Sequence, residues 1–224
     1  MDREADRHAR GLATLERIGG PDAAAPILAI TDIAPDLARF AIDFAFGEVL
    51  CRPGLDPKMR ELCTVAALAA LGHAPSQLAW HADCALNVGW RPSEVLEAVI
   101  AGVVCGSSTE AGTSLRVARE VFARREVGGD ALAELDAAVA RWCEVPPVIE
   151  DLDLDRRSRA LIVIAALTAA GRARSRLAGP LREALAAGAS RVEVIEATEQ
   201  MAVYAGFPAA LNGIAAAREV LDRG

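Results

Sequence analysis

An internal duplication constrains the fold of this chain most strongly. Shifting the 224-residue sequence by 99 positions (154 − 55) aligns Leu154–Leu221 with Leu55–Phe122 without a gap, and 26 of the 68 aligned positions (221 − 154 + 1) are identical. The shared residues mark helix starts, helix ends and apolar faces, such as the closing motifs VAREVF and AAREVL. We therefore expect two similar helical units that pack against each other.

The positions that differ between the copies carry most of the reactive side chains. His81 aligns with Pro180, Glu61 with Ala160, Cys84 with Glu183, and Cys105 with Tyr204. The chemistry of the two copies therefore differs, and the His and Glu candidates lie in the first copy.

The composition indicates a helical protein. Hydrophobic residues make up 53% of the chain but aromatic residues only 4%, and no run of β-branched and aromatic residues typical of a strand stands out. Apolar residues instead recur at helical spacing. We predict an all-α fold in which the two tandem copies pack as a pseudo-dimer.

The expected helices run from Arg3 to Ile18, Asp36 to Leu50, Leu62 to Leu71 and Pro75 to Val88, and Pro92 opens another. The helix at 62–71 is apolar almost all round, so we expect it to be buried at the centre. On the helix that Pro92 opens, we expect Glu94 and Glu97 to face outward.

Gly and Pro clusters suggest four parts. These are an N-terminal helix and connecting segment (1–35), the first copy (36–127), a linker helix with an acidic loop (128–153), and the second copy (154–224). The linker helix is expected from about Asp130 to Cys143.

Charge and cysteine usage exclude several classes of protein. The excess of 31 acidic over 24 basic residues argues against a nucleic-acid partner. The N-terminal MDREADRHARGL has no apolar core, and no apolar run is long enough for a membrane span, so we expect a cytoplasmic protein without a membrane partner. The five cysteines form no CxxC or zinc pattern, so we expect free thiols, no metal and no cofactor.

Several motifs occur together in a recognisable order. The first copy has FGEVLCRPGLDPKMRELCTVAALAALG, then His81 followed eight residues later by Gly89, then PSEVLEAVI; the second has VEVIEATEQMAVYAGFPAALNGIAAAREVL. Residues 36–122 and 154–222 thereby resemble the carboxymuconolactone decarboxylase family. The resemblance implies an all-α domain that assembles as a trimer or hexamer, and two copies per chain would imply a homotrimer.

The resemblance implies two known chemistries. One is cofactor-free decarboxylation of 4-carboxymuconolactone; the other is peroxide reduction of the alkylhydroperoxidase D type, which uses a CxxC motif before a His and a Glu on the preceding helix. The family's His matches His81 and its Glu most nearly matches Glu61. The two cysteines would fall at about Ala74 and Gln77, so CxxC chemistry is not expected.

The copies also depart from the family pattern in complementary ways. The second copy keeps the YAG-x-P turn at residues 204–208 but has Pro180 in place of the His; the first copy keeps the His but has Cys105-Gly106-Ser107-Ser108-Thr109 at the turn. We predict one working pocket per chain, centred on His81, with the second copy as scaffold or as one wall.

The candidate catalytic residues are His81, Glu61 and Cys84. A histidine changes charge near neutral pH, so His81 could supply a proton, and Glu61 could fix its tautomer from the neighbouring helix. Cys84 lies three residues after His81 and is either a weak acid or part of the pocket lining.

The candidate substrate-binding residues are Arg60, Arg52 and Trp80. Either arginine could hold a substrate carboxylate. Arg60 recurs as Arg159 in the copy without the His, which favours a structural role for it. Trp80 could wall a pocket for a ring or pack at an interface.

These residues favour a cofactor-independent decarboxylase or isomerase-type lyase that acts on a lactone or other cyclic carboxylic acid in aromatic compound metabolism. Two alternatives stay open. One is a thiol-dependent hydroperoxidase or reductase using Cys84 and His81, with Cys105 as a resolving partner. The other is a non-catalytic ligand-binding or assembly protein, because half of the duplicated pocket residues have been replaced.

Overall fold

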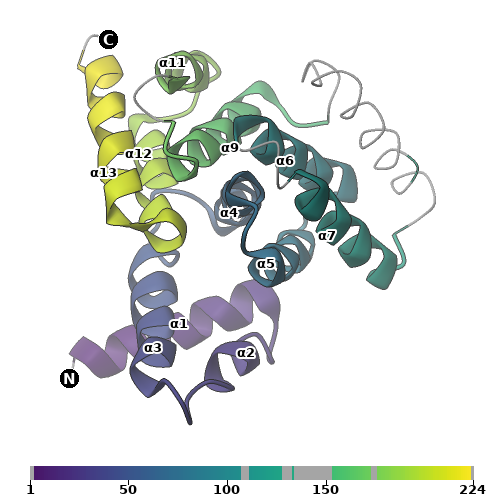
Figure 1. The fold of residues 1–224 in the computed structure, drawn as a ribbon. Helices are drawn as coiled ribbons and strands as arrows, with labels where there is room; N and C mark the ends of the chain where they lie inside the picture. The colour runs from purple at the N-terminus through teal and green to yellow at the C-terminus, as the bar shows by residue number, and fades with distance from the viewer. Residues whose placement is uncertain (1–2, 107–110, 128–132, 134–152, 173–175, 223–224) are drawn as a thin grey trace. The chain divides into compact units, whose positions relative to one another are not determined.

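The computed structural model describes residues 3–106, 111–127, 133, 153–172 and 176–222. Every regular element within these ranges is a helix (Figure 1). The prediction of an all-α fold is confirmed. The expected linker helix at 130–143, including Cys143, lies outside the described residues.

The chain forms two compact units, Met1–Pro57 and Lys58–Gly224. The N-terminal unit holds α1 (Arg3–Gly19), α2 (Ala25–Leu28), α3 (Pro35–Phe40) and η1 (Ala41–Val49). α3 and η1 together form the helix expected at 36–50, but its second half has π geometry: the Leu50 N–H donates to the Ala45 carbonyl, five residues earlier, at 2.8 Å.

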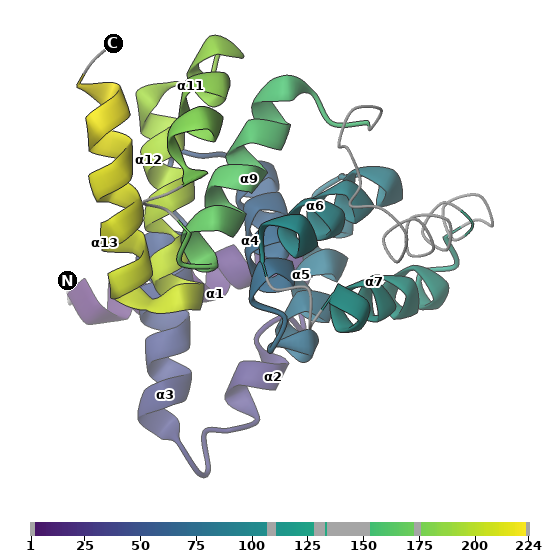
Figure 2. The same ribbon diagram turned by 45° about the horizontal axis from the view of Figure 1, so that its top comes forward.

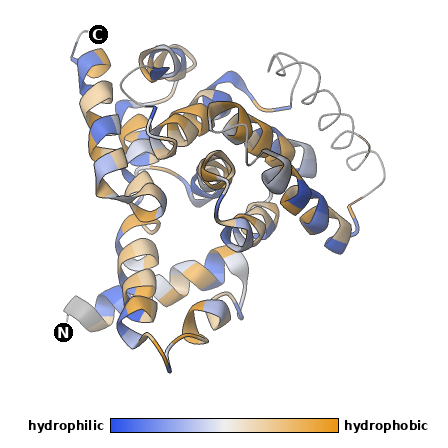
Figure 3. Ribbon diagram, viewed as in Figure 1, coloured by the Kyte–Doolittle hydropathy of each residue, from blue (hydrophilic) through white to orange (hydrophobic). Residues whose placement is uncertain are grey.

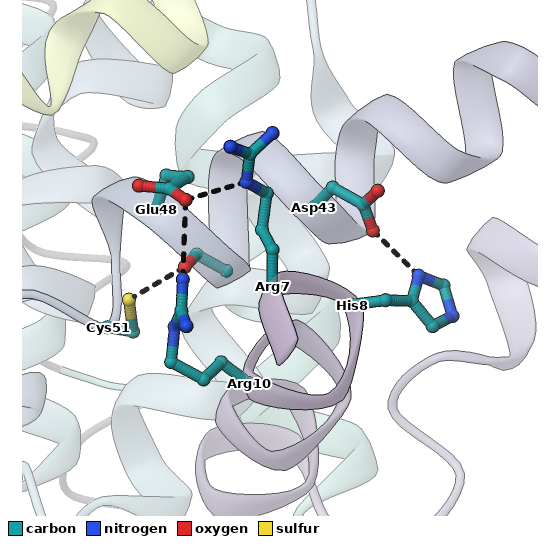
Figure 4. A network of polar contacts seen from close by, with 7 residues as sticks. Arg7, His8, Arg10, Asp43, Glu48 and Cys51 are labelled. Atoms are coloured by element: carbon teal, nitrogen blue, oxygen red, sulfur yellow. Dashed lines mark hydrogen bonds and ion pairs between the residues drawn. The ribbon is translucent and has the colours of Figure 1, made fainter. Parts of the chain in front are cut away.

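Polar contacts join α1 to η1 in the N-terminal unit (Figure 4). Arg7 and Arg10 both donate to the Glu48 carboxylate, at 2.6 and 3.3 Å. His8 Nδ1 lies 2.6 Å from Asp43 Oδ1. The first helix of the sequence is thus held on η1 by charged groups as well as by apolar packing.

The helix formed by α3 and η1 has two apolar faces. One is buried and includes Ala38, Ile42, Ala45, Phe46 and Val49. The other, here called the α3–η1 stripe, consists of Leu37, Phe40 and Phe44, which are 59%, 58% and 38% exposed. The helical spacing of apolar residues thus marks both a packed face and an exposed one.

The larger unit contains both copies. The first copy supplies α4 (Pro57–Leu71), α5 (Pro75–Asn87), α6 (Pro92–Cys105) and α7 (Ala111–Arg124); the second supplies α9 (Arg156–Ala169), α11 (Ala178–Ala186), α12 (Arg191–Glu199) and α13 (Met201–Leu221). The 99-residue shift places α4 on α9, α5 on α11 and α6 on α12. The four-part division of the chain proposed from the sequence stays a prediction.

α4 lies at the centre of this unit, as its all-apolar sequence predicts. Each residue from Met59 to Ala70 is buried. Figure 1 shows α4 end-on with α5, α6 and α9 around it, and Figure 3 shows the apolar residues concentrated on α4, α6 and α9. The helices of both copies therefore share one core.

Two reciprocal ion pairs join the copies. Arg60 on α4 donates to Glu196 on α12 at 2.7 Å, and Arg159 on α9 donates to Glu97 on α6 at 2.6 Å. The 99-residue shift converts Arg60 into Arg159 and Glu97 into Glu196, so each pair is the image of the other. Figure 2 shows α6 and α12 packed beside α9. The predicted pseudo-dimer of two copies is confirmed.

The expectation that Glu97 faces outward is wrong. Its side chain is fully buried, where it accepts hydrogen bonds from Arg159 and from the Leu154 N–H at 2.8 Å. Desolvation raises the pKa of Glu97, and the bond from Arg159 opposes this shift. Helical periodicity in one copy does not reveal the cation that the other copy supplies.

α13 contains a break just after Tyr204. Gly206 has φ 81° and ψ 163°, a conformation that glycine alone adopts readily, and Pro208 follows it. This break is the YAG-x-P turn identified in the sequence, and it ends the helical turn that carries Tyr204.

Among the described residues, no helix has both the length and the hydropathy that a membrane span requires.

Candidate functional site

His81 and Glu61 form a buried pair. His81 lies on α5 and Glu61 on the central helix α4, and His81 Nδ1 lies 2.7 Å from Glu61 Oε2. The two residues are 4% and 1% exposed. The structure thus brings together the two residues for which the sequence predicted an acid–base pair, even though 20 positions separate them.

The second ring nitrogen of His81, Nε2, faces a residue of the second copy. The hydroxyl of Tyr204, on α13, lies 3.4 Å from His81 Nε2. The Trp80 and Tyr204 rings meet the imidazole edge-on, with centroids 4.7 and 5.4 Å away. His81 is therefore held on three sides by Glu61, Trp80 and Tyr204.

The Tyr204 side chain keeps some solvent exposure, but its hydroxyl lies inside the protein. Burial raises the pKa of this hydroxyl well above its ordinary value, and the nearby Glu61 carboxylate raises it further. A hydrogen bond from Thr64 acts in the opposite direction. Tyr204 is therefore a neutral phenol that can donate its hydrogen to His81.

Arg60 takes part in a network between the copies rather than lying open to solvent. It is 1% exposed, and besides its ion pair with Glu196 it donates to Gln200 Oε1 at 3.1 Å. In the opposite direction, Gln200 Nε2 donates a hydrogen bond to the Arg60 carbonyl at 3.1 Å. These contacts support the structural role that the recurrence of Arg60 as Arg159 suggested.

Cys84 lies on the same helix as His81 and is buried. Desolvation raises the pKa of its thiol, the Glu61 and Asp83 charges raise it further, and Arg125 lowers it. Cys84 is therefore a protonated thiol in the resting protein, which is the form suited to lining a site and unsuited to nucleophilic attack.

Two of the predicted substrate-binding residues, Trp80 and Arg52, are half-buried. Trp80 is half-buried next to His81. Arg52 is half-buried and belongs to the N-terminal unit. Among the described residues, no group of three His, Cys, Asp or Glu side chains could hold a metal ion.

Sequence reasoning missed the contribution of the second copy's polar residues. Glu196, Gln200 and Tyr204 recur every four positions, and they face Arg60 and Thr64, which are also four apart. This spacing is visible in the sequence, since neighbours on a helix surface are three or four apart. The pairing of the two series is not, because the residues that meet are at least 136 positions apart.

The fold and site define an all-α protein with two repeated copies and a buried His–carboxylate pair between helices of the first. The chain belongs to the carboxymuconolactone decarboxylase family, whose model matches residues 35–120 and again residues 133–219. It is also similar to a 4-carboxymuconolactone decarboxylase from Acinetobacter baylyi (strain ATCC 33305 / BD413 / ADP1), with 32% identity over 93 residues that cover 42% of this chain and 69% of the relative.

Proposed function

We propose that this protein is a cofactor-independent lyase that decarboxylates a lactone or another cyclic carboxylic acid, with His81 as the proton-transfer group. The observation that carries the proposal is the buried His81–Glu61 pair, at 2.7 Å. A carboxylate bonded to Nδ1 fixes the orientation of the imidazole and stabilises its protonated form. Membership of the family and the similarity to the Acinetobacter decarboxylase also support the proposal.

The proposed reaction needs no external electron acceptor. When the bond between the ring carbon and the carboxylate breaks, its electron pair moves into the conjugated carbonyl system of the substrate and CO₂ leaves. His81, which solvent first protonates at Nε2, then gives that proton to the resulting carbanion and returns to its neutral form. Because His81 is buried, this step takes place away from bulk water. Removal of water from the substrate carboxylate favours its departure as CO₂.

Cys84 contributes to the site as a neutral side chain in this account. A thiol peroxidase needs a thiolate nucleophile, and burial together with the Glu61 charge disfavours that form of Cys84. The thiol-dependent alternative therefore has less support than proton transfer through His81.

Thiol labelling of the folded protein tests the role of Cys84. We expect iodoacetamide at pH 8 to label the half-buried Cys51 faster than Cys84 and Cys105, because burial raises the pKa of the Cys84 thiol and raises that of Cys105 from 9.0 to about 11. For Cys105, this shift alone lowers the thiolate fraction about 100-fold. Mass spectrometry of the labelled peptides, with a urea-unfolded sample as control, gives the rates. If Cys84 is labelled as fast as Cys51 in the folded protein, the result would support the thiol-dependent hydroperoxidase alternative.

A decarboxylation assay tests the function itself. The wild-type protein is incubated in D₂O with 4-carboxymuconolactone and a panel of related cyclic acids, without metal or reductant. We expect CO₂ release from at least one acid, with one deuterium bound to carbon in the product. Reduction of an alkyl hydroperoxide with a dithiol, combined with no CO₂ from any acid, would point to the thiol-dependent alternative instead.

We also propose that the chain assembles as a homotrimer. The exposed α3–η1 stripe supports self-association, because adjacent exposed large apolar side chains are typical of contact surfaces. Sedimentation equilibrium gives the mass of the assembly directly. A cytoplasmic location and a role in aromatic compound metabolism also remain proposals.

A further inference from the structure

The second copy supplies a hydroxyl to the site of the first copy. Tyr204 and His81 are 123 positions apart, yet the Tyr204 hydroxyl lies 3.4 Å from His81 Nε2. Tyr204 is on α13 of the second copy, whereas His81 is on α5 of the first. The imidazole therefore has a first-copy partner at Nδ1 and a second-copy partner at Nε2.

The partners of His81 determine which atom donates the hydrogen in each of its contacts. An ionised Glu61 can only accept a hydrogen bond, so Nδ1 carries the hydrogen that bridges the 2.7 Å contact. In the neutral imidazole, Nε2 is then an acceptor. The neutral Tyr204 phenol faces that acceptor and donates to it.

The orientation of Tyr204 is set by a chain of donors behind it. Arg60 can only donate, so its contact at 3.1 Å identifies the oxygen of the Gln200 amide. The nitrogen of that amide then donates to the Arg60 carbonyl at 3.1 Å and to Thr64 Oγ1 at 3.4 Å. Thr64 in turn bonds to Tyr204. The hydrogen bonds that lead from Gln200 to Thr64, on to Tyr204 and finally to His81 thus run in one direction.

The duplication provides an internal comparison for this chain. The positions equivalent to Gln200 and Tyr204 in the first copy are Ala101 and Cys105, and Val163 takes the place of Thr64 in the second. The reciprocal Arg–Glu pairs, by contrast, occur in both copies. The hydrogen-bonding residues Thr64, Gln200 and Tyr204 therefore occur on the side of the duplication that contains His81 and are replaced on the other side. The Arg–Glu ion pairs occur on both sides.

We propose that Tyr204 is a positioning residue which, oriented by Gln200 and Thr64, holds Nε2 of His81 by donating a hydrogen bond to it. Its part in turnover rests on the function proposed above; its contact with His81 does not. The second copy is then a working half of the site rather than only a scaffold for it.

Removal of the hydroxyls has graded consequences. Tyr204→Phe removes the donor to Nε2, and Thr64→Val removes only the group that orients this donor. Because Tyr204 acts through His81, we expect Tyr204→Phe to lower kcat about 3- to 10-fold, as for loss of one hydrogen bond, with KM unchanged within about twofold. We expect a smaller decrease in kcat for Thr64→Val.

¹⁵N NMR of the imidazole nitrogens tests the contact without a substrate. The protein contains three histidines, His8, His73 and His81, so labelling with ¹⁵N-histidine gives few signals, and His81→Gln assigns those of His81. In the wild type we expect a protonated Nδ1 and a hydrogen-bonded Nε2. In Tyr204→Phe the Nε2 signal should move toward that of a free acceptor, and in Thr64→Val it should move less.

Thr168→Val is the matched control. Thr168 is also a buried threonine on the central helix of its copy, but its hydroxyl donates to the Ile164 carbonyl of its own helix at 2.7 Å. We expect no change at His81 Nε2 in this variant. An Nε2 signal that stays at its wild-type position in Tyr204→Phe would overturn the proposal, whatever the activity. The expected shift in a protein that releases CO₂ from no acid would support the hydrogen bond and count against the proposed lyase function.

Discussion

Replacement of Arg60 by methionine is expected to lower the free energy of unfolding by about 3–5 kcal/mol, because it leaves a buried carboxylate without its cation. Arg60 and Glu196 are 1% and 6% exposed at their side chains and 2.7 Å apart. Gln200 would also lose the donor to its Oε1 atom. Urea unfolding followed by circular dichroism measures the change.

Arg116→Met is the matched control for this prediction. Arg116 and Glu120 form an ion pair of similar length, 2.6 Å, but their side chains are 59% and 58% exposed. Exposed pairs one helical turn apart contribute about 0.3–0.5 kcal/mol, so we expect little change in stability. The double variant Arg60→Met/Glu196→Leu should recover part of the loss, since the unpaired charge is removed. Equal effects of Arg60→Met and Arg116→Met would contradict a buried ion pair between the copies.

Replacement of Glu61 by glutamine is expected to lower kcat by about 100-fold or more, within the range that general acid–base groups supply. Glutamine has nearly the same size and could still accept a hydrogen bond from Nδ1. It lacks the negative charge that stabilises a protonated His81 during proton transfer. Steady-state kinetics on whichever acid the wild type decarboxylates gives the ratio of kcat values.

The N-terminal unit offers a matched control for Glu61→Gln. His8 and Asp43 form the same kind of pair, with Nδ1 and Oδ1 2.6 Å apart (Figure 4). Asp43→Asn therefore makes the same chemical change at a histidine with no proposed part in the reaction, and kcat should stay within about twofold. Thermal unfolding of both variants separates a loss of chemistry from a loss of folding. A Glu61→Gln enzyme as active as Asp43→Asn would remove Glu61 from the mechanism.

The sequence predicted the elements of this fold well because the duplication lets each copy be compared with the other. Shared glycines and prolines mark helix ends, and the apolar sequence of α4 predicts its central position. The meeting of His81 and Glu61 also followed, since adjacent helices with a short loop between them pack side by side.

What the sequence did not reveal depends on contacts between the copies. Glu97 has the helical position of an outward-facing residue, and its burial follows from Arg159, 62 positions later. Tyr204 could be recognised as part of a family motif, but its approach to His81 is a tertiary contact that no local pattern encodes. The π geometry of η1 likewise has no sequence signal that distinguishes it from an α-helix.

The most direct test of the account compares CO₂ release by the wild type, His81→Ala and His8→Ala, without metal or reductant. If His81 transfers the proton, His81→Ala should lose about 10²- to 10⁴-fold in kcat/KM while it remains folded, and His8→Ala should match the wild type. An acid that the wild type and His81→Ala decarboxylate at equal rates would contradict the account, because the reaction would then proceed without the buried His81–Glu61 pair.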